Sequence, residues 1–216
     1  MAPFSFGAIG LAAASALLAP IAASGGLWVA RATDPALAQI SAALRPSSIA
    51  VASSLALGIA LAARPASAPG FLVCACLAGS AAADRDRFVL PDCLTLAAVA
   101  LGLAFRPFAS SSSRLELLGA GLGLYLVGTI FAVTMRAWRG RAAFGQGDVK
   151  LIAGLGVLLP LNLLAPAVLA GAASALASAC LSARPSRRAI ALGVHLVIGA
   201  GVALGADSAF PRLLER

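Results

Sequence analysis

Two aspartates in this chain lie where apolar segments meet polar ones, and carboxyl groups placed there could do chemistry. Asp84 ends the run FLVCACLAGSAAAD, and Asp148 begins the run DVKLIAGLGVLLP. An ionisable group at the edge of an apolar segment is costly to bury, so it indicates either a functional site or a buried ion pair. When two carboxyls approach closely, one keeps a proton while the other ionises. Such a pair can deprotonate water for attack on a peptide carbonyl and protonate the leaving amide nitrogen.

The sequence around the second aspartate, FGQGDVKLIAGLG, places a glycine-flanked acid at the start of a predicted helix. We expect Gly145 and Gly147 to allow close backbone approach and unusual dihedral angles beside Asp148, as an extended substrate strand would require. Lys150 follows two positions later. Its ammonium group could either tune the pKa of Asp148 or reach towards lipid phosphates, and the sequence favours neither interpretation.

The sequence around the first aspartate, DRDRFVLPDCLTL, contains a Pro-Asp pair that is typical of a helix start. We interpret Pro91 as the turn that begins the helix and Asp92 as its N-cap rather than as a substrate contact. Asp86, between two arginines, is interpreted as part of an interfacial charge cluster and not as a third catalytic acid.

Other catalytic chemistries have little support in the sequence. The single histidine, His195, cannot form a histidine cluster and is expected to be a hydrogen-bonded packing residue, and no G-x-S-x-G motif occurs. No cysteine pair has the C-x-x-C spacing of zinc or redox sites. We therefore expect no metal and no cofactor, and we interpret as buried structural thiols the four cysteines Cys74, Cys76, Cys93 and Cys180.

The elements that must position these aspartates are membrane helices. Of the 216 residues, 61% are hydrophobic and 11% are charged, and the mean hydropathy is +0.97. A soluble protein of this length needs far more polar surface. The net charge of +8 would suggest nucleic-acid binding in a soluble protein, but here the basic residues lie between apolar segments, where membrane topology explains them. We predict an all-α, multi-spanning membrane bundle with the lipid bilayer as a partner and no nucleic acid.

Apolar stretches predict eight spans, with seven as the alternative. We expect residues 1–65 to form N-terminal spans whose role the sequence does not place, and residues 66–216 to form the domain that carries both aspartate motifs. No basic residue precedes the first apolar run, so we expect that span to be retained. The predicted spans are 4–26, 47–63, 66–83, 93–105, 115–135, 148–165, 166–183 and 189–206.

The basic residues divide unevenly between alternate connections. Eleven lie in one set of loops, which includes Arg31, Arg85 and Arg136, and five lie in the other, which includes Arg64 and Arg114. The positive-inside rule places the larger set in the cytoplasm, with both chain ends outside if there are eight spans. Both aspartate motifs then face the cytoplasm.

The joint pattern resembles the type IV prepilin peptidases, which are G-x-G-D membrane aspartic proteases. It consists of D-x-x-x-x-x-x-P-D from Asp84 to Asp92 and G-x-G-D-V-K from Gly145 to Lys150, and the similarity covers roughly residues 66–183. The resemblance implies that Asp84 and Asp148 are catalytic. It further implies a bacterial inner-membrane enzyme that cleaves a short basic leader, typically after a glycine, from pilin or pseudopilin precursors at the cytoplasmic face.

Longer members of that family carry an insert with two C-x-x-C pairs and also N-methylate the new terminus. This chain lacks that insert and is similar to the short forms found with tight-adherence (Flp-type) pilus systems. Methylation with S-adenosylmethionine is therefore not expected.

Two alternatives remain beside this interpretation, and a third, the presenilin class, is disfavoured by the order of its motifs. The aspartates could be structural partners of nearby cations, or the acids of a transporter or assembly component that binds protons or ions. The presenilin class also uses G-x-G-D, but its partner motif is Tyr-Asp, whereas Ala83 precedes Asp84. Its Pro-Ala-Leu motif follows the G-x-G-D motif, whereas here Pro-Ala-Leu occurs only at 35–37, well before Asp84.

Overall fold

The structure is a computed structural model that describes residues 6–34, 43–63, 68–108, 113–139, 145–181 and 191–214. The Pro-Ala-Leu sequence at 35–37 lies outside this part of the chain. The described residues form eight α-helices and no strand, which confirms the predicted all-α class. The helices are α1 (Phe6–Thr33), α2 (Pro46–Ala63), α3 (Ala68–Arg87), α4 (Asp92–Phe105), α5 (Arg114–Arg139), α6 (Gln146–Leu158), α7 (Leu161–Leu181) and α8 (Leu192–Leu214).

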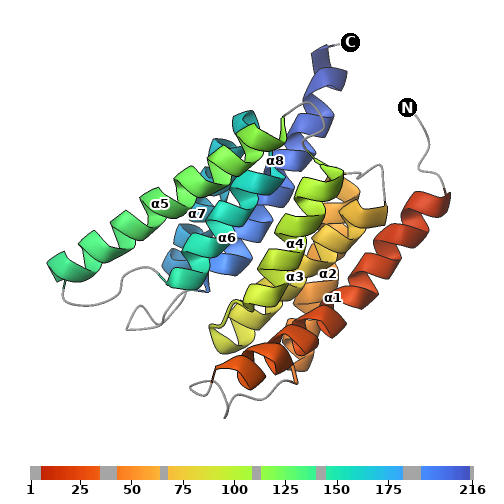
Figure 1. Cartoon of the computed structure of the whole chain (residues 1–216). Helices are drawn as coiled ribbons and strands as arrows, with labels where there is room; N and C mark the ends of the chain where they lie inside the picture. The colour runs from red at the N-terminus through yellow and green to blue at the C-terminus, as the bar shows by residue number, and fades with distance from the viewer. Residues whose placement is uncertain are drawn as a thin grey trace.

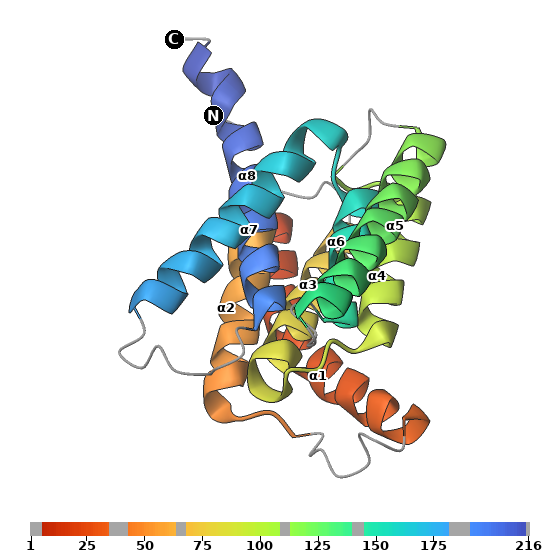
Figure 2. The same ribbon diagram turned by 90° about the vertical axis from the view of Figure 1, so that its left-hand side faces the viewer.

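The helices form one bundle in which α3 is central (Figure 1). α3 packs against α1, α2, α4 and α8, and α4 and α8 each pack in turn against α6. α5 packs against α6 and α7 against α8, so both lie on the outside of the bundle (Figure 2). α4 and α8 therefore connect α3, the helix that carries Asp84, with α6, the helix that carries Asp148.

Small residues allow the helices to approach closely. Ala78, Ala82 and Ala83 of α3 are completely buried in a cluster that includes alanines of α1 and α2. Between α7 and α8, a Cβ atom added at Gly199 would collide with the backbone of Ala167. Without a hydrophobic driving force between helices in lipid, such close van der Waals packing holds a membrane bundle together.

Three helices are long and apolar enough to cross a membrane by length and composition, over Ala12–Thr33, Arg114–Trp138 and Leu161–Leu181. Three further apolar helices are shorter, over Pro46–Ala60, Asp92–Phe105 and Leu192–Asp207. α6 has 13 residues and therefore extends only about 20 Å, less than the thickness of a bilayer core, about 30 Å. Together with the apolar outer surface of α5, these helices identify the chain as a membrane protein.

The break between α6 and α7 differs from the predicted one at 165/166. α6 ends at Leu158, and α7 begins at Leu161 with the carbonyl of Pro160 accepting the N–H of Leu163 at 2.9 Å. Pro160 precedes the first turn of α7, where its missing N–H costs nothing, whereas Pro166 lies inside α7. Of the two prolines, the first ends the helix, which shortens α6 relative to the predicted 148–165.

Candidate active site

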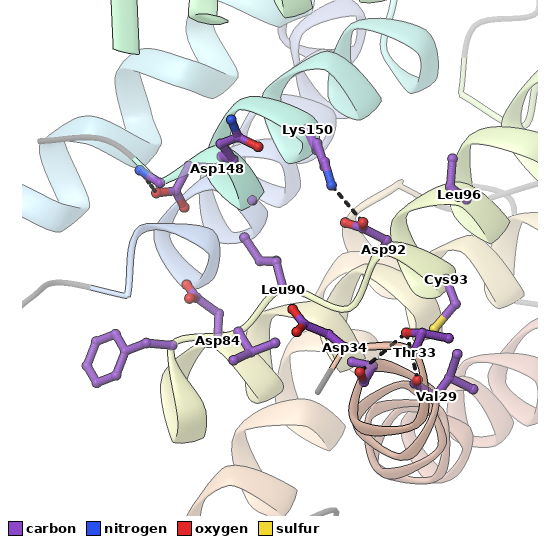
Figure 3. A pocket seen from close by; sticks show the side chains of 16 residues that line it. Val29, Thr33, Asp34, Asp84, Leu90, Asp92, Cys93, Leu96, Asp148 and Lys150 are labelled. Atoms are coloured by element: carbon purple, nitrogen blue, oxygen red, sulfur yellow. Dashed lines mark hydrogen bonds and ion pairs between the residues drawn. The ribbon is translucent and has the colours of Figure 1, made fainter. Parts of the chain in front are cut away.

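A cavity of about 590 Å³ opens at one end of the bundle, where α3 ends and where α4 and α6 begin (Figure 3). Both Asp84 and Asp148 line it, and their carboxyl groups point into it from two different helices. The last turn of α1 and the link between α3 and α4 complete its wall. The lining residues are Val29, Ala30, Thr33, Asp34, Asp84, Phe88, Val89, Leu90, Asp92, Cys93, Leu96, Gly145, Gln146, Gly147, Asp148 and Lys150.

Asp84 is held between the end of α3 and the beginning of α8. α3 ends because Phe88 adopts a left-handed φ of 54° and donates its N–H to the carbonyl of Asp84 at 2.7 Å. The buried Asp84 carboxylate accepts the backbone N–H of Gly193 at 2.8 Å. Because Gly193 is in the first turn of α8, this N–H has no partner within its helix, and the carboxylate satisfies it.

Asp148 occupies the first turn of α6. Its Oδ2 accepts the N–H of Gly145, the N-cap residue, at 3.3 Å. A carboxylate in this position satisfies one unpaired backbone donor and interacts favourably with the helix dipole. Both acids of the predicted pair are therefore fixed by backbone N–H groups at helix starts, which leaves part of each carboxyl directed into the cavity.

The two glycines of the second motif lie close to neighbouring side chains, but they do not have the predicted unusual dihedral angles. Gly145 has φ −75° and ψ 144°, which any residue can adopt, and Gly147 has no left-handed φ. A Cβ atom at Gly145 would lie 3.1 Å from Oδ2 of Asp148, and one at Gly147 would lie 3.0 Å from Cβ of Leu90. The glycines are needed for space around Asp148 and around the α3–α4 link, not for backbone strain.

The electrostatics of the cavity couple the two acids. Asp84 lies just beyond Ala83, the last residue of the apolar stretch of α3. Burial and, to a smaller extent, the negative charge of Asp148 together raise the pKa of Asp84 to about 6, although the backbone N–H groups of Gly193 and Val194 act in the opposite direction. At mildly acidic pH, Asp84 therefore keeps a proton that an exposed aspartate would have lost.

Asp92 and Lys150 form an ion pair with each other, a contact that the sequence did not predict. The N-cap of α4 is Pro91, which is fully buried, and Asp92 is the first helical residue with no side-chain cap. Pro91 thus begins the helix as predicted, but Asp92 as N-cap is wrong, because its carboxylate instead binds Lys150. The Lys150 Nζ lies 2.6 Å from Oδ2 of Asp92, so this ion pair joins the first turn of α4 to α6.

Asp86 forms the predicted charge cluster in part, with Arg87 and with Arg45 in place of Arg85. Its carboxylate lies 3.5 Å from Nε of Arg87 and 3.2 Å from Nε of Arg45, and it also accepts the N–H of Arg45 at 3.1 Å. Arg45 directly precedes α2, so the cluster ties the start of α2 to the end of α3. Arg85, the other neighbour of Asp86, is exposed.

Two further predictions concern His195 and the four cysteines. His195 shares a hydrogen bond of 2.8 Å with Ser174, which confirms it as a hydrogen-bonded packing residue between α7 and α8. The four cysteines are free thiols. Cys74 is buried and Cys76 and Cys93 are half-buried, but Cys180 is exposed, so the prediction of a buried thiol is wrong there.

Sequence reasoning missed two contributions to the cavity. The end of α1, with Thr33 and Asp34, lines it, although residues 1–65 were given no role. The predicted topology already indicated that the end of α1 could lie near the site, because it placed the 31–45 connection on the same side of the membrane as both motifs. The backbone of Gly193 was also missed, and nothing in the sequence links it to Asp84, from which it is 109 residues away.

Comparisons with known proteins bear on the family to which the chain belongs. No curated protein and no solved structure gives a significant match to the chain. The family model described as the type IV leader peptidase family matches residues 71–182, just over half of the chain and a range that contains both Asp84 and Asp148. The chain therefore belongs to the type IV leader peptidase family, and it is a membrane-embedded peptidase whose family acts on prepilin-type substrates.

Proposed function

We propose that this protein is an aspartic endopeptidase in which Asp84 and Asp148 form the catalytic pair. The observation that carries the proposal is that the two carboxyls, which lie 64 positions apart in the sequence, line one cavity at one end of the bundle. The family membership supplies the peptidase activity, and the paired carboxyls supply chemistry that needs no covalent intermediate.

The carboxyl groups differ in their partners, which suggests a division of roles. Asp84, buried and with its raised pKa, holds a proton as the general acid. Asp148, at the start of α6, is assigned the role of general base, and in its ionised form it takes a proton from a water molecule. The water oxygen attacks the peptide carbonyl carbon, the Asp84 proton passes to the amide nitrogen, and the carbon–nitrogen bond breaks. Proton exchange with solvent then restores the starting pair.

The proposed substrate is a pilin or pseudopilin precursor whose basic leader lies in the cytoplasm and whose apolar helix lies in the bilayer. The uneven distribution of basic residues supports a cytoplasmic position for the end of the bundle that carries the cavity. The scissile bond would reach the carboxyl pair at the membrane interface, where water is available. The substrate helix then need not unwind through the whole bilayer.

Co-expression with a pilin precursor tests this function. An aspartic leader peptidase shortens the precursor, which migrates faster on a gel, and mass spectrometry of the product locates the cut. The matched control is the same protein with Asp148→Asn. A precursor that keeps its leader beside the unsubstituted protein contradicts the proposal and favours an ion-binding role for the acids.

A further inference from the structure

The ion pair between Asp92 and Lys150 connects the two chain segments that carry the proposed catalytic carboxyls. Lys150 lies two residues after Asp148 on α6, and Asp92 begins α4, which follows Asp84 after the short link 88–91. The pair joins these segments at 2.6 Å (Figure 3). α4 packs against both α3 and α6, so the pair lies at the contact through which α3 and α6 are held relative to each other.

A second contact at the same place has the opposite chemical character. Leu90, in the link after α3, lies so close to Gly147 that a Cβ there would be 3.0 Å from its side chain. This contact is apolar and tolerates sliding, whereas an ion pair at hydrogen-bond distance favours one separation and orientation. The ion pair is therefore the contact that favours one particular separation and orientation of the two motifs.

The position of the pair also places it beside a second cavity. A mainly apolar cavity of about 310 Å³ lies between α4, α5 and α6, and Asp92, Leu96 and Lys150 line both it and the cavity that contains the carboxyls. The side chains of Lys150 and Asp92 are 38% and 57% exposed, so the pair is open at the boundary of the two cavities.

We propose that Asp92 and Lys150 are a positioning pair that sets the separation of Asp84 and Asp148, an inference that rests on the proposed function. The expected effects on the rate and on stability distinguish a positioning role from a stabilising one. A partly exposed ion pair contributes little to stability, but a misplacement of about 1 Å at a catalytic centre can lower the rate about 100-fold. A positioning pair is therefore expected to affect kcat far more than stability.

Three variants test the proposal by leader cleavage in detergent or liposomes: Lys150→Gln, Asp92→Asn and the two combined. We expect kcat to fall about ten-fold or more in each single variant, with KM and the melting midpoint nearly unchanged. The combined variant should be no slower than the slower single one, because both substitutions remove the same interaction. Losses that multiply in the combined variant, or an unchanged kcat in Lys150→Gln, overturn the proposal.

The matched control is Asp207→Asn, an equivalent carboxyl-to-amide change at an exposed position of α8. Asp207 lies 14 residues beyond Gly193 on the same helix, about 21 Å along its axis from the first turn. Its kcat is expected to equal that of the unsubstituted protein. A loss in this control equal to that in Asp92→Asn would overturn the assignment of the effect to the ion pair.

A cross-linking measurement reports the same link without using activity. In a protein whose native cysteines are replaced by serine, Leu90→Cys and Gly147→Cys should oxidise rapidly to a disulfide. Their Cβ atoms would start 3.0 Å apart, so a small outward shift brings them to the separation of about 3.8 Å that a disulfide needs. We expect Lys150→Gln to slow this oxidation several-fold, and an unchanged rate overturns the positioning role. If the unsubstituted protein cleaves no precursor, the proposed function fails, whereas the cross-linking rate still decides whether the pair holds α4 and α6 in place.

Discussion

The carboxylate of Asp84 accepts the backbone N–H of Gly193 at 2.8 Å, so the end of α3 is fixed by the first turn of α8. This contact exists because residue 193 has no side chain. A Cβ atom there would lie 2.8 Å from Oδ2 of Asp84 and 3.3 Å from the side chain of Leu90. The first turn of α8 thus packs directly against the carboxylate of Asp84, although α8 lies outside the residues matched by the family model.

We therefore expect Gly193→Ala to lower kcat about ten-fold or more, because the new methyl group displaces the Asp84 carboxyl from its N–H partner. The matched control is Gly123→Ala on α5, where a Cβ atom would meet nothing within 4 Å. Steady-state cleavage of a precursor peptide by both variants, beside their melting midpoints, makes the comparison. Equal activity of the two variants would show that the Asp84–Gly193 contact has no part in catalysis.

Asp84→Asn and Asp148→Asn should each abolish leader cleavage while the protein remains folded in the membrane. Each change removes one ionisable carboxyl with little change in volume, so the pair loses its shared proton while packing is preserved. Gel shift of a co-expressed precursor measures activity, and size-exclusion elution of the purified protein checks folding. Processing at close to the normal rate by either variant contradicts the role of that residue.

Cleavage should weaken as pH rises, because the proposed general acid must carry a proton. Burial, together with the charge of Asp148, raises the pKa of Asp84 to about 6, so the protonated form is lost above that value. We expect kcat/KM to fall on the alkaline side with an apparent pKa near this value, which belongs to the coupled pair. A rate that stays constant from pH 5 to 9, measured on a peptide without titrating groups near the scissile bond, contradicts this assignment.

The same shift predicts a pH-dependent stability. Because the pKa of Asp84 rises from 3.8 to about 6 on folding, the folded protein binds this proton more tightly than the unfolded chain. The ionised carboxyl therefore destabilises the fold above about pH 6, and the penalty disappears as pH falls towards 3.8. Asp84→Asn should remove this contribution, which makes the melting midpoint of the variant less dependent on pH across that interval. Identical profiles for the two proteins would contradict the shift.

The sequence predicted most of the helices and both motifs, because apolar stretches and isolated acids are local signals. It placed the start of α4 after Pro91 and recognised Asp84 and Asp148 as the acids that needed explanation. The break before α7 was predicted at the wrong proline, since the effect of a proline depends on its position relative to the first turn of a helix. The residue type alone therefore does not distinguish Pro160, which precedes α7, from Pro166, which lies inside it.

The contacts that complete the cavity could not be predicted from local pattern. The ion pair of Asp92 with Lys150 joins residues 58 positions apart, and the Asp84–Gly193 contact joins residues 109 positions apart. Both depend on how α4, α6 and α8 pack, which periodicity does not determine. The place of Asp34 in the cavity wall was missed for a different reason, because a single acid in a basic connection is indistinguishable from a solvated loop residue.

Labelling of single cysteines should place the cavity on the cytoplasmic side. Residue 143 lies outside the described residues, in the connection that leads from α5 to the second motif, and Ser113 precedes the opposite end of α5. α5 has 26 residues and extends about 39 Å, enough to cross a bilayer core, about 30 Å, so the two positions flank one span. In a protein whose native cysteines are replaced by serine, Ala143→Cys should react with a membrane-impermeant thiol reagent only from the cytoplasmic side. Ser113→Cys should react only from outside. Reaction of the cysteine at 143 in intact cells would reverse the topology, and the carboxyl pair could then not meet a basic leader that stays in the cytoplasm.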